Sequence, residues 1–212
     1  MFSGHLSFLC GRTLQVLCSK PVMLSYRTVI FGLWITTLVY WAVTAVRDRK
    51  YYAARSRGPS SAPFTLGFLL LTYLILQLPS VHERVERLST VDVGPERGIA
   101  SMLLVVAGTG LAIWARAHLG KNWGIPMTVK QKPELVTSGP YKTIRHPIYA
   151  GFMLALLGST LTTGVIWIVV LLPVCGYFVF SAFREEKALA SEFSAQYAEY
   201  KKRSRMLLPF IF

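Results

Sequence analysis

Long apolar runs separated by short polar segments dominate the pattern along the chain. Residues 29–46, 63–79 and 98–115 are three such runs, and each approaches the roughly 20 residues that a helix needs to cross the hydrocarbon core of a bilayer. The run from 148 to 183 is almost free of charge and is too long for one span. The segment GSTLTTG at 158–164 interrupts it, so we interpret this run as two helices joined by a tight turn. The pattern therefore predicts an all-α integral membrane protein with about five spanning helices.

The two ends of the chain differ from this apolar middle. Residues 1–28 include the apolar run LSFLC, but a glycine and an arginine follow it directly, so we expect an irregular or interfacial segment. Between 184 and 203, four apolar or aromatic residues recur at helical spacing: Leu189, Phe193, Tyr197 and Tyr200. This spacing predicts an amphipathic helix that lies on the membrane surface or covers a site. We accordingly divide the chain into the N-terminal segment, three spans over 29–115 and a C-terminal core over 116–212.

The charge balance favours a membrane protein over a nucleic-acid-binding one. Only 16% of the residues are charged, against about 25% in a typical soluble domain. Segments 47–62, 116–146 and 184–212 hold 17 of the 23 Lys and Arg residues, and 1–28 and 80–97 hold the other six. Alternation of five helices places the richer segments on one face, which the positive-inside rule predicts to be cytoplasmic. The net charge of +13 therefore needs no nucleic-acid partner. The three cysteines form no CxxC pair and predict neither a disulfide scaffold nor a metal site.

One polar stretch, GPYKTIRHPIYAG at 139–151, crowds turn-forming residues against the start of the fourth span. Pro147 lacks an amide hydrogen and has a preset φ, so we expect the helix to begin at about His146–Pro147. The N-terminus of a helix attracts anions, and Arg145 lies at that end beside His146. Tyr149 follows one turn further along the helix. The stretch therefore predicts a polar site at the cytoplasmic end of this span.

A second polar group returns to the same membrane face. The helical hairpin ends at Phe183, so Glu185 and Glu186 must lie on the face that holds His146. Cationic and aromatic groups on one segment and carboxylates on the other suit a ligand that carries both charge signs. S-adenosyl-L-methionine is such a ligand, because it has a sulfonium cation and an amino-acid carboxylate. A haem or quinone site at a membrane edge is compatible with the same histidine and tyrosine.

Three motifs in the last part of the chain resemble one enzyme family. They are LVTSGPYKTIRHPIYAGF at 135–152, REEKALASEFSAQYAEYKKR at 184–203 and LLPFIF at 207–212. Their order and spacing resemble the isoprenylcysteine carboxyl methyltransferase family and its phospholipid-methylating relatives, and LGKNW at 119–123 fits the prokaryotic branch. The resemblance implies a membrane methyltransferase that uses S-adenosyl-L-methionine. It also implies that the C-terminal helix and tail close the cofactor pocket on the cytoplasmic side.

The resemblance also implies roles for individual residues. The eukaryotic enzymes carry a substrate-contacting Arg one turn before the carboxylate equivalent to Glu185, where this chain has Ser181. Arg184 is nearby but faces another direction on a helix. We therefore predict Arg145 and Glu185 as catalytic residues, with Arg145 holding an acceptor carboxylate. The contacts to S-adenosyl-L-methionine implied by the family pattern are Leu135, Val136, Tyr141, His146, Pro147, Ile148, Tyr149 and Glu185.

The expected reaction is an in-line transfer of a methyl group to a lipophilic acceptor. A carboxylate is already ionised at neutral pH and needs no general base, whereas an amine must first lose a proton. This difference favours carboxyl O-methylation of an isoprenylcysteine-like substrate, with N-methylation of a phospholipid or other lipid as the alternative. A sterol-reductase-like NADPH oxidoreductase and a non-enzymatic lipid-binding module are further alternatives. The expected partners are a lipophilic or prenylated substrate and membrane lipids, with no nucleic acid and no metal. We place the protein in a membrane, multi-pass, with its active site on the cytoplasmic side.

Overall fold

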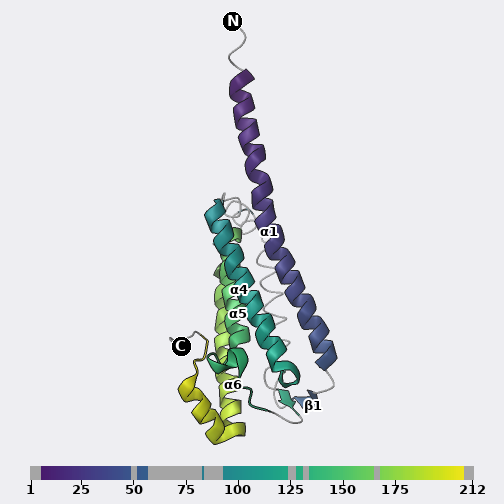
Figure 1. Cartoon of the computed structure of the whole chain (residues 1–212), viewed down its shortest axis with the longest axis vertical. Coiled ribbons are helices and arrows are strands. Elements are labelled where there is room, and N and C mark those ends of the chain that lie inside the picture. Colours follow the sequence, from purple (N-terminus) through teal and green to yellow (C-terminus); the bar gives the residue numbers. More distant parts are fainter. Residues whose placement is uncertain are drawn as a thin grey trace.

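The computed structural model describes most of the chain as a bundle of long helices (Figure 1). The described residues are 6–48, 52–56, 83, 93–123, 128–130, 134–164 and 168–207. Four long helices lie within these ranges: α1 (Leu6–Asp48), α4 (Pro95–Leu119), α5 (Pro147–Thr163) and α6 (Ile168–Arg203). Two 3₁₀ turns accompany them, η2 (Gly120–Asn122) and η3 (Gly139–Lys142). The strands are β1 (Tyr52–Ser56) and β2 (Thr128–Lys130).

The membrane-spanning character of the first and third predicted spans is supported. Within the described residues, Tyr26–Asp48 of α1 and the whole of α4 are long and apolar enough to cross a membrane, and α5 is a shorter apolar helix. The predicted second span, 63–79, lies outside the described residues. The prediction of five spans therefore stays a prediction, while the helical architecture is confirmed.

The start of the chain is helical, whereas we expected an irregular or interfacial segment for 1–28; an interfacial location stays a prediction. The structure has a continuous helix from Leu6 to Asp48, and Figure 1 shows its first turns extending beyond the other labelled helices. The glycine that follows LSFLC is Gly11, and a single glycine inside a helix costs only about 1 kcal/mol relative to alanine. Such a residue weakens a helix without ending it, which is why the sequence pattern was misleading here.

The two short strands are a second departure from the expected all-α fold. β1 and β2 pair antiparallel, with Tyr52 opposite Lys130 and Ser56 opposite Thr128. The ribbon joins the segment after α1 to the segment after α4, near the ends of both helices (Figure 1). It is a small addition to a helical fold.

Helices α4 and α5 approach each other closely enough for their backbones to touch. A Cβ atom at Gly108 would lie 2.5 Å from the backbone nitrogen of Ala155 and from the carbonyl oxygen of Gly151. Near the other end of the contact, the Ser101 hydroxyl donates a hydrogen bond of 2.6 Å to the carbonyl oxygen of Gly158. Small residues permit this approach, which is a common way of joining helices within a bilayer. The close contact fixes the position of α5, and therefore of the polar stretch at its N-terminus.

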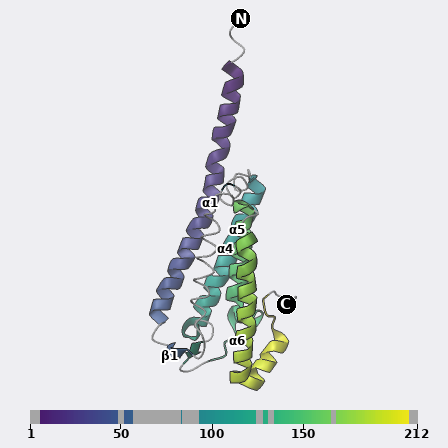
Figure 2. The ribbon, with the colours of Figure 1, turned by 180° about the vertical axis from the view of Figure 1, so that it is seen from behind.

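Helix α6 reverses direction near its end. Its backbone is helical except at Ser194, where φ is 38° and ψ is −107°. The turns after Ser194 fold back toward the start of α5, as the yellow end of the ribbon shows in Figures 1 and 2. The predicted amphipathic helix is therefore the continuation of the last apolar helix, and its final part covers the polar stretch. Tyr197 and Tyr200 are buried there, with 1% and 3% of their surface exposed.

Candidate functional site

The loop before α5 packs against the C-terminal end of α4. The His118 ring lies 2.9 Å from the Ser138 hydroxyl, and the Tyr141 hydroxyl donates a weak hydrogen bond of 3.4 Å to the carbonyl oxygen of Ala115. Gly139 has a φ of +58°, and a Cβ atom at this position would lie 2.7 Å from the His118 ring. The left-handed backbone therefore favours glycine here, and a larger residue would also have to displace the exposed His118 ring.

Helix α5 begins where the sequence predicted. His146 is the N-cap residue and Pro147 is the first helical residue, and both are buried. The His146 side chain makes no capping hydrogen bond to the helix, so its ring is free to interact elsewhere. The predicted start of this helix, at about His146–Pro147, is thus confirmed. That the helix spans a membrane stays a prediction.

The loop before α5 pairs through its backbone with the segment after α6. The Arg145 and His146 amides donate to the carbonyl oxygens of Arg205 and Met206 at 2.7 and 3.0 Å. The Arg205 amide donates in turn to the carbonyl oxygen of Thr143 at 2.9 Å. We refer to these three hydrogen bonds as the C-terminal pairing. The sequence pattern gave no indication of it, because it depends on the reversal of α6 at Ser194.

His146, Tyr149 and Glu185 converge as the hairpin argument predicted. The Tyr149 hydroxyl donates a hydrogen bond of 2.7 Å to one oxygen of the Glu185 carboxylate. The other Glu185 oxygen lies 3.4 Å from Nδ1 of His146. The His146 and Tyr149 rings are stacked with their centroids 5.6 Å apart, and Phe178 stacks on Tyr149 at 4.9 Å. The cluster thus joins an imidazole, a carboxylate and two aromatic faces at the start of α5.

Arg145 does not point into open space, as a free ligand for an acceptor would. Its Nε lies 2.6 Å from Oε1 of Glu186, and its Nη1 donates a hydrogen bond of 2.7 Å to the carbonyl oxygen of Ser204. Only 10% of its side chain is exposed. The predicted contact of Arg145 with an acceptor carboxylate therefore requires this pair to open. Sequence reasoning left the role of Glu186 open and missed its pairing with Arg145, since consecutive glutamates at a helix end are usually solvated.

The carboxylate of Glu186 is the most enclosed acidic group of the site. Only 8% of its side chain is exposed, and its Oε2 lies 3.1 Å from Nζ of Lys201. Burial alone would raise its pKa, but the interactions with His146, Arg145 and Lys201 outweigh burial and lower the pKa to about 2. Glu186 is therefore an ionised group at neutral pH, held among cations.

The imidazole of His146 lies between the two glutamates. Burial disfavours its charged form, but the carboxylates of Glu185 and Glu186 favour it, and the net effect raises the pKa of His146. Nε2 of His146 is buried and lies 3.7 Å from Glu186, too far for a hydrogen bond. One buried polar atom of the site thus lacks a hydrogen-bond partner in the described part of the chain, which suits a ligand with an acceptor group.

Arg184, the other arginine of this region, faces away from the cluster. Its side chain is exposed, and its guanidinium lies 5.8 Å from the centroid of the Phe180 ring on the surface of α6. Ser181, at the position of the substrate-contacting Arg of the eukaryotic family members, is buried with 1% of its surface exposed. Neither residue contributes a cation to the cluster around His146.

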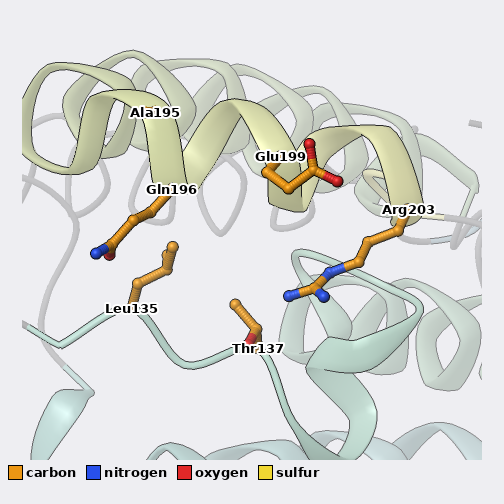
Figure 3. A pocket seen from close by; sticks show the side chains of 6 residues that line it. All are labelled: Leu135, Thr137, Ala195, Gln196, Glu199 and Arg203. Carbon is orange, nitrogen blue, oxygen red and sulfur yellow. The ribbon is translucent and has the colours of Figure 1, made fainter.

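The remaining predicted cofactor contacts lie on the loop and at the start of α5. Leu135 lines a cleft of about 490 Å³ between the loop and the folded-back end of α6. Figure 3 shows Leu135 and Thr137 on the loop side of this cleft; the residues on the opposite side are Ala195, Gln196, Glu199 and Arg203. Val136 and Ile148 are half-buried. Tyr141 is buried, and its carbonyl oxygen accepts a hydrogen bond of 2.6 Å from the Tyr200 hydroxyl. The cleft is lined by one predicted contact, Leu135, and the residues that line it do not include the cluster at His146.

Comparison with known proteins finds one family match over the part of the chain that contains the cluster at His146. Residues 97–196 match the model of the phospholipid methyltransferase family. The matched region extends from the start of α4 through the loop, α5 and most of α6, and so contains the cluster at His146.

Particular relatives fall into several groups. The protein-S-isoprenylcysteine O-methyltransferase of Rattus norvegicus is 33% identical over 116 residues, which cover 53% of this chain and 41% of that protein. The cobalt-zinc-cadmium resistance protein CzcN of Cupriavidus metallidurans is 29% identical over 114 residues, covering 52% of this chain and 51% of that protein. Methanethiol S-methyltransferase 2 of Bradyrhizobium diazoefficiens is 36% identical over 73 residues, covering 34% of this chain and 27% of that protein.

These matches confirm the resemblance that the motifs indicated and support a methyltransferase. The aligned regions span about half, or less, of the length of the relatives they match. One relative is named for metal resistance, but the described residues contain no group of three or more His, Cys, Asp or Glu side chains placed to hold a metal ion. The comparisons give no support to the sterol-reductase-like alternative.

Proposed function

We propose that this chain is an integral membrane methyltransferase that takes its methyl group from S-adenosyl-L-methionine. The observation that carries the proposal is the convergence of His146, Tyr149 and Glu185 at the start of α5, within the region that matches the methyltransferase family. When bound, S-adenosyl-L-methionine supplies an electrophilic methyl group on a sulfonium centre. The residues of the cluster supply the binding groups that such a ligand needs.

The chemistry of the cluster fits both charges of this cofactor. The Glu185 carboxylate is 27% exposed, and together with the faces of Tyr149 and Phe178 it favours a cation. The buried Nε2 of His146, at the N-terminus of α5, favours an anionic group. On the loop, Leu135 and Val136 offer apolar surface beside the cleft. We propose that these residues, with Tyr141, Pro147 and Ile148, form the cofactor pocket.

The role of the chain in catalysis is alignment and exclusion of water. Holding two reactants in line removes much of the entropic barrier of a bimolecular step, an effect equivalent to roughly 7–11 kcal/mol in favourable cases. The folded-back end of α6 covers the start of α5, and we propose that it excludes water from the pocket. No proton has to be removed from a carboxylate acceptor, so none of these residues needs to act as a general base.

The acceptor that we favour is a lipophilic carboxylate such as a prenylated cysteine. The relatives named as protein-S-isoprenylcysteine O-methyltransferases support it, as does the lack of a required base. The match to the phospholipid methyltransferase family favours a lipid amine as a second candidate. In both cases the acceptor would enter from the membrane and the cofactor from the cytoplasmic face, which is the face predicted by the basic residues.

The test is a binding and turnover experiment with the purified full chain. We expect isothermal titration calorimetry to detect binding of S-adenosyl-L-methionine and of its demethylated product, and no binding of NADPH. His146→Ala and Glu185→Ala should each weaken cofactor binding by about ten- to a hundredfold, the usual cost of losing a charge-assisted hydrogen bond. The exposed Glu192→Ala, on the same helix as Glu185, is the matched control. Transfer of labelled methyl to farnesylated cysteine, but not to phosphatidylethanolamine, would select between the two acceptors.

Two results would overturn this proposal. Binding of NADPH without binding of S-adenosyl-L-methionine would favour the reductase alternative. Wild-type affinity in both folded cluster variants would separate the cofactor from the cluster at His146.

A further inference from the structure

We infer that Glu186 is a positioning residue, which acts with Arg145 and Lys201 to hold the folded-back end of α6 against the loop before α5. The kinetic part of this inference rests on the proposed methyltransferase function. It gives the two neighbouring glutamates different tasks: Glu185 faces the ligand, and Glu186 holds the wall of the pocket. It also gives Arg145 a task other than contact with the acceptor.

One carboxylate joins three parts of the chain. Oε1 of Glu186 lies 2.6 Å from Nε of Arg145 on the loop, and Oε2 lies 3.1 Å from Nζ of Lys201. Lys201 lies beyond the reversal at Ser194, whereas Glu186 lies before it. The Glu186 carboxylate therefore bridges the two arms of α6 and ties both to the start of α5.

Arg145 binds the same C-terminal segment a second time. Its Nη1 donates to the carbonyl oxygen of Ser204, while its amide donates to the carbonyl oxygen of Arg205. The guanidinium thus contacts Glu186 and Ser204 together, a two-point grip that suits its planar shape. The side chain of Arg145 and the C-terminal pairing therefore both bind the backbone of residues 204–206.

His146 links this arrangement to the ligand site. Its Nδ1 lies 3.4 Å from Glu185, and its Nε2 lies 3.7 Å from Glu186. Consecutive residues of a helix point about 100° apart, so the two carboxylates reach opposite edges of the ring. Loss of Glu186 would leave Arg145 as a buried cation without its carboxylate, and such an unpaired charge is strongly unfavourable. The loop and the imidazole would then shift, and the cofactor site would change although Glu185 is intact.

The experiment compares Glu186→Gln with two matched controls. Glu192→Gln removes an exposed carboxylate from the same helix, and Lys202→Gln is the exposed neighbour of Lys201→Gln. For each variant, four quantities are measured: hydrogen exchange of the Arg145, His146 and Arg205 amides, the affinity for S-adenosyl-L-methionine, and the KM values for the cofactor and for farnesylated cysteine. The three amides are the donors of the C-terminal pairing, so their exchange reports whether the pairing is intact, and this readout does not depend on enzyme activity.

We expect Glu186→Gln to speed exchange at the three amides and to weaken cofactor affinity by about tenfold, within the range of indirect coupling. The cofactor KM should rise with that loss, and the acceptor KM should stay within about twofold of wild type. Lys201→Gln should speed exchange at the three amides and weaken cofactor affinity by about threefold. The effect is smaller because the Lys201 side chain is half exposed and its ion pair is screened by solvent. Both controls should behave as wild type. If Glu186→Gln does not fold, Lys201→Gln against Lys202→Gln carries the test.

A double-mutant cycle of Arg145→Gln with Glu186→Gln completes the test. If the two residues act as one unit, the double variant should bind the cofactor no worse than the weaker single variant. Additive losses would overturn the inference, as would unchanged exchange at the three amides. A lower melting temperature with unchanged affinity and KM values would show a purely structural role and would also overturn it. Failure of the wild-type protein to bind S-adenosyl-L-methionine would instead overturn the proposed function, and the exchange measurements would still decide whether Glu186 holds the segment.

Discussion

Two enclosed arginine–carboxylate pairs lie in the described part of this molecule, and they differ in their neighbours. Arg116 at the end of α4 lies 2.6 Å from Asp48 at the end of α1, and none of its side chain is exposed. Its guanidinium lies 4.2 Å from the centroid of the Trp123 ring and donates to the carbonyl oxygen of Gly120. All of these partners belong to helix ends. The pair fastens α1 to α4.

The pair of Arg145 and Glu186 has the same separation of 2.6 Å but a different setting. It adjoins an imidazole, a second carboxylate and a lysine, and its side chains keep 10% and 8% exposure. A buried ion pair is by itself weak evidence for stability, because desolvation offsets much of the attraction. Our proposal that the cluster at His146 serves a ligand therefore rests on the neighbours of the pair and not on the pair itself.

The largest expected effect is at the pair of Asp48 and Arg116. Asp48→Asn removes the charge that compensates fully buried Arg116 and should destabilise the protein by about 3–5 kcal/mol. Thermal unfolding in detergent measures this, with Arg47→Gln as the control because Arg47 is 62% exposed beside the same carboxylate. Folded Asp48→Asn protein should keep its affinity for S-adenosyl-L-methionine. A large loss of affinity without loss of stability would reverse the assignment of the two pairs.

The second effect concerns the backbone contact that positions α5. Gly108→Ala places a methyl group 2.5 Å from backbone atoms of α5 and should cost about 1–3 kcal/mol, as overpacking does. Gly110→Ala is the matched control, because no atom lies within 4 Å of a Cβ atom there. It should be neutral or stabilising, since alanine is the better helix former. Equal melting temperatures for the two variants would contradict the close packing of α4 and α5.

The sequence predicted the parts of this fold that depend on local pattern. The start of α5 follows from Pro147, and the meeting of His146 with Glu185 follows from hairpin topology. The C-terminal pairing was not predictable, because it requires a left-handed residue at Ser194, where serine gives no signal of the kind that glycine would. The hydrogen bond from Arg145 to the carbonyl oxygen of Ser204 depends on that same reversal. The sequence therefore indicated that His146 and Glu185 would meet, but not which of two neighbouring glutamates each cation would bind.

The third prediction uses pH to test the pair of Arg145 and Glu186. The pKa of Glu186 is lowered from 4.5 to about 2 in the folded protein, so its contribution to stability is present above about pH 4.5 and is lost as the pH falls toward 2. The charged groups that face it are Arg145 and His146 from the loop and Lys201 from the folded-back arm. We expect protection of the three amides of the C-terminal pairing to fall across this window. Glu186→Gln protein has no carboxylate to protonate there and should show no such step.

The loss of stability at higher pH is expected from His146. Its pKa is raised in the folded protein, so the stability that its charged form contributes is complete below the ordinary histidine value of about 6.5 and is lost as the pH rises through the folded pKa. His146→Ala should remove this loss of stability at higher pH and leave a weaker acidic step, because His146 is one of the groups that lower the pKa of Glu186. A wild-type protection profile with neither a fall below about pH 4.5 nor a loss as the pH rises above about 6.5 would contradict both assignments.

The smallest expected effect is that of Arg145→Lys, and it separates the two roles considered for this residue. A lysine keeps the charge beside Glu186 but has a single ammonium group, which cannot bind the Glu186 carboxylate and the Ser204 carbonyl oxygen in one planar grip. As a positioning residue, Arg145→Lys should weaken cofactor affinity by only about threefold and leave the acceptor KM unchanged, since most of the electrostatic term survives. An acceptor ligand would behave differently: turnover with farnesylated cysteine would fall sharply while cofactor affinity stayed normal. Arg184→Lys, on the exposed surface of α6, is the comparison for a cation that does not reach the cluster. Measurement of cofactor affinity, acceptor KM and kcat in these two variants therefore decides whether Arg145 positions the folded-back end of α6 or contacts the methyl acceptor.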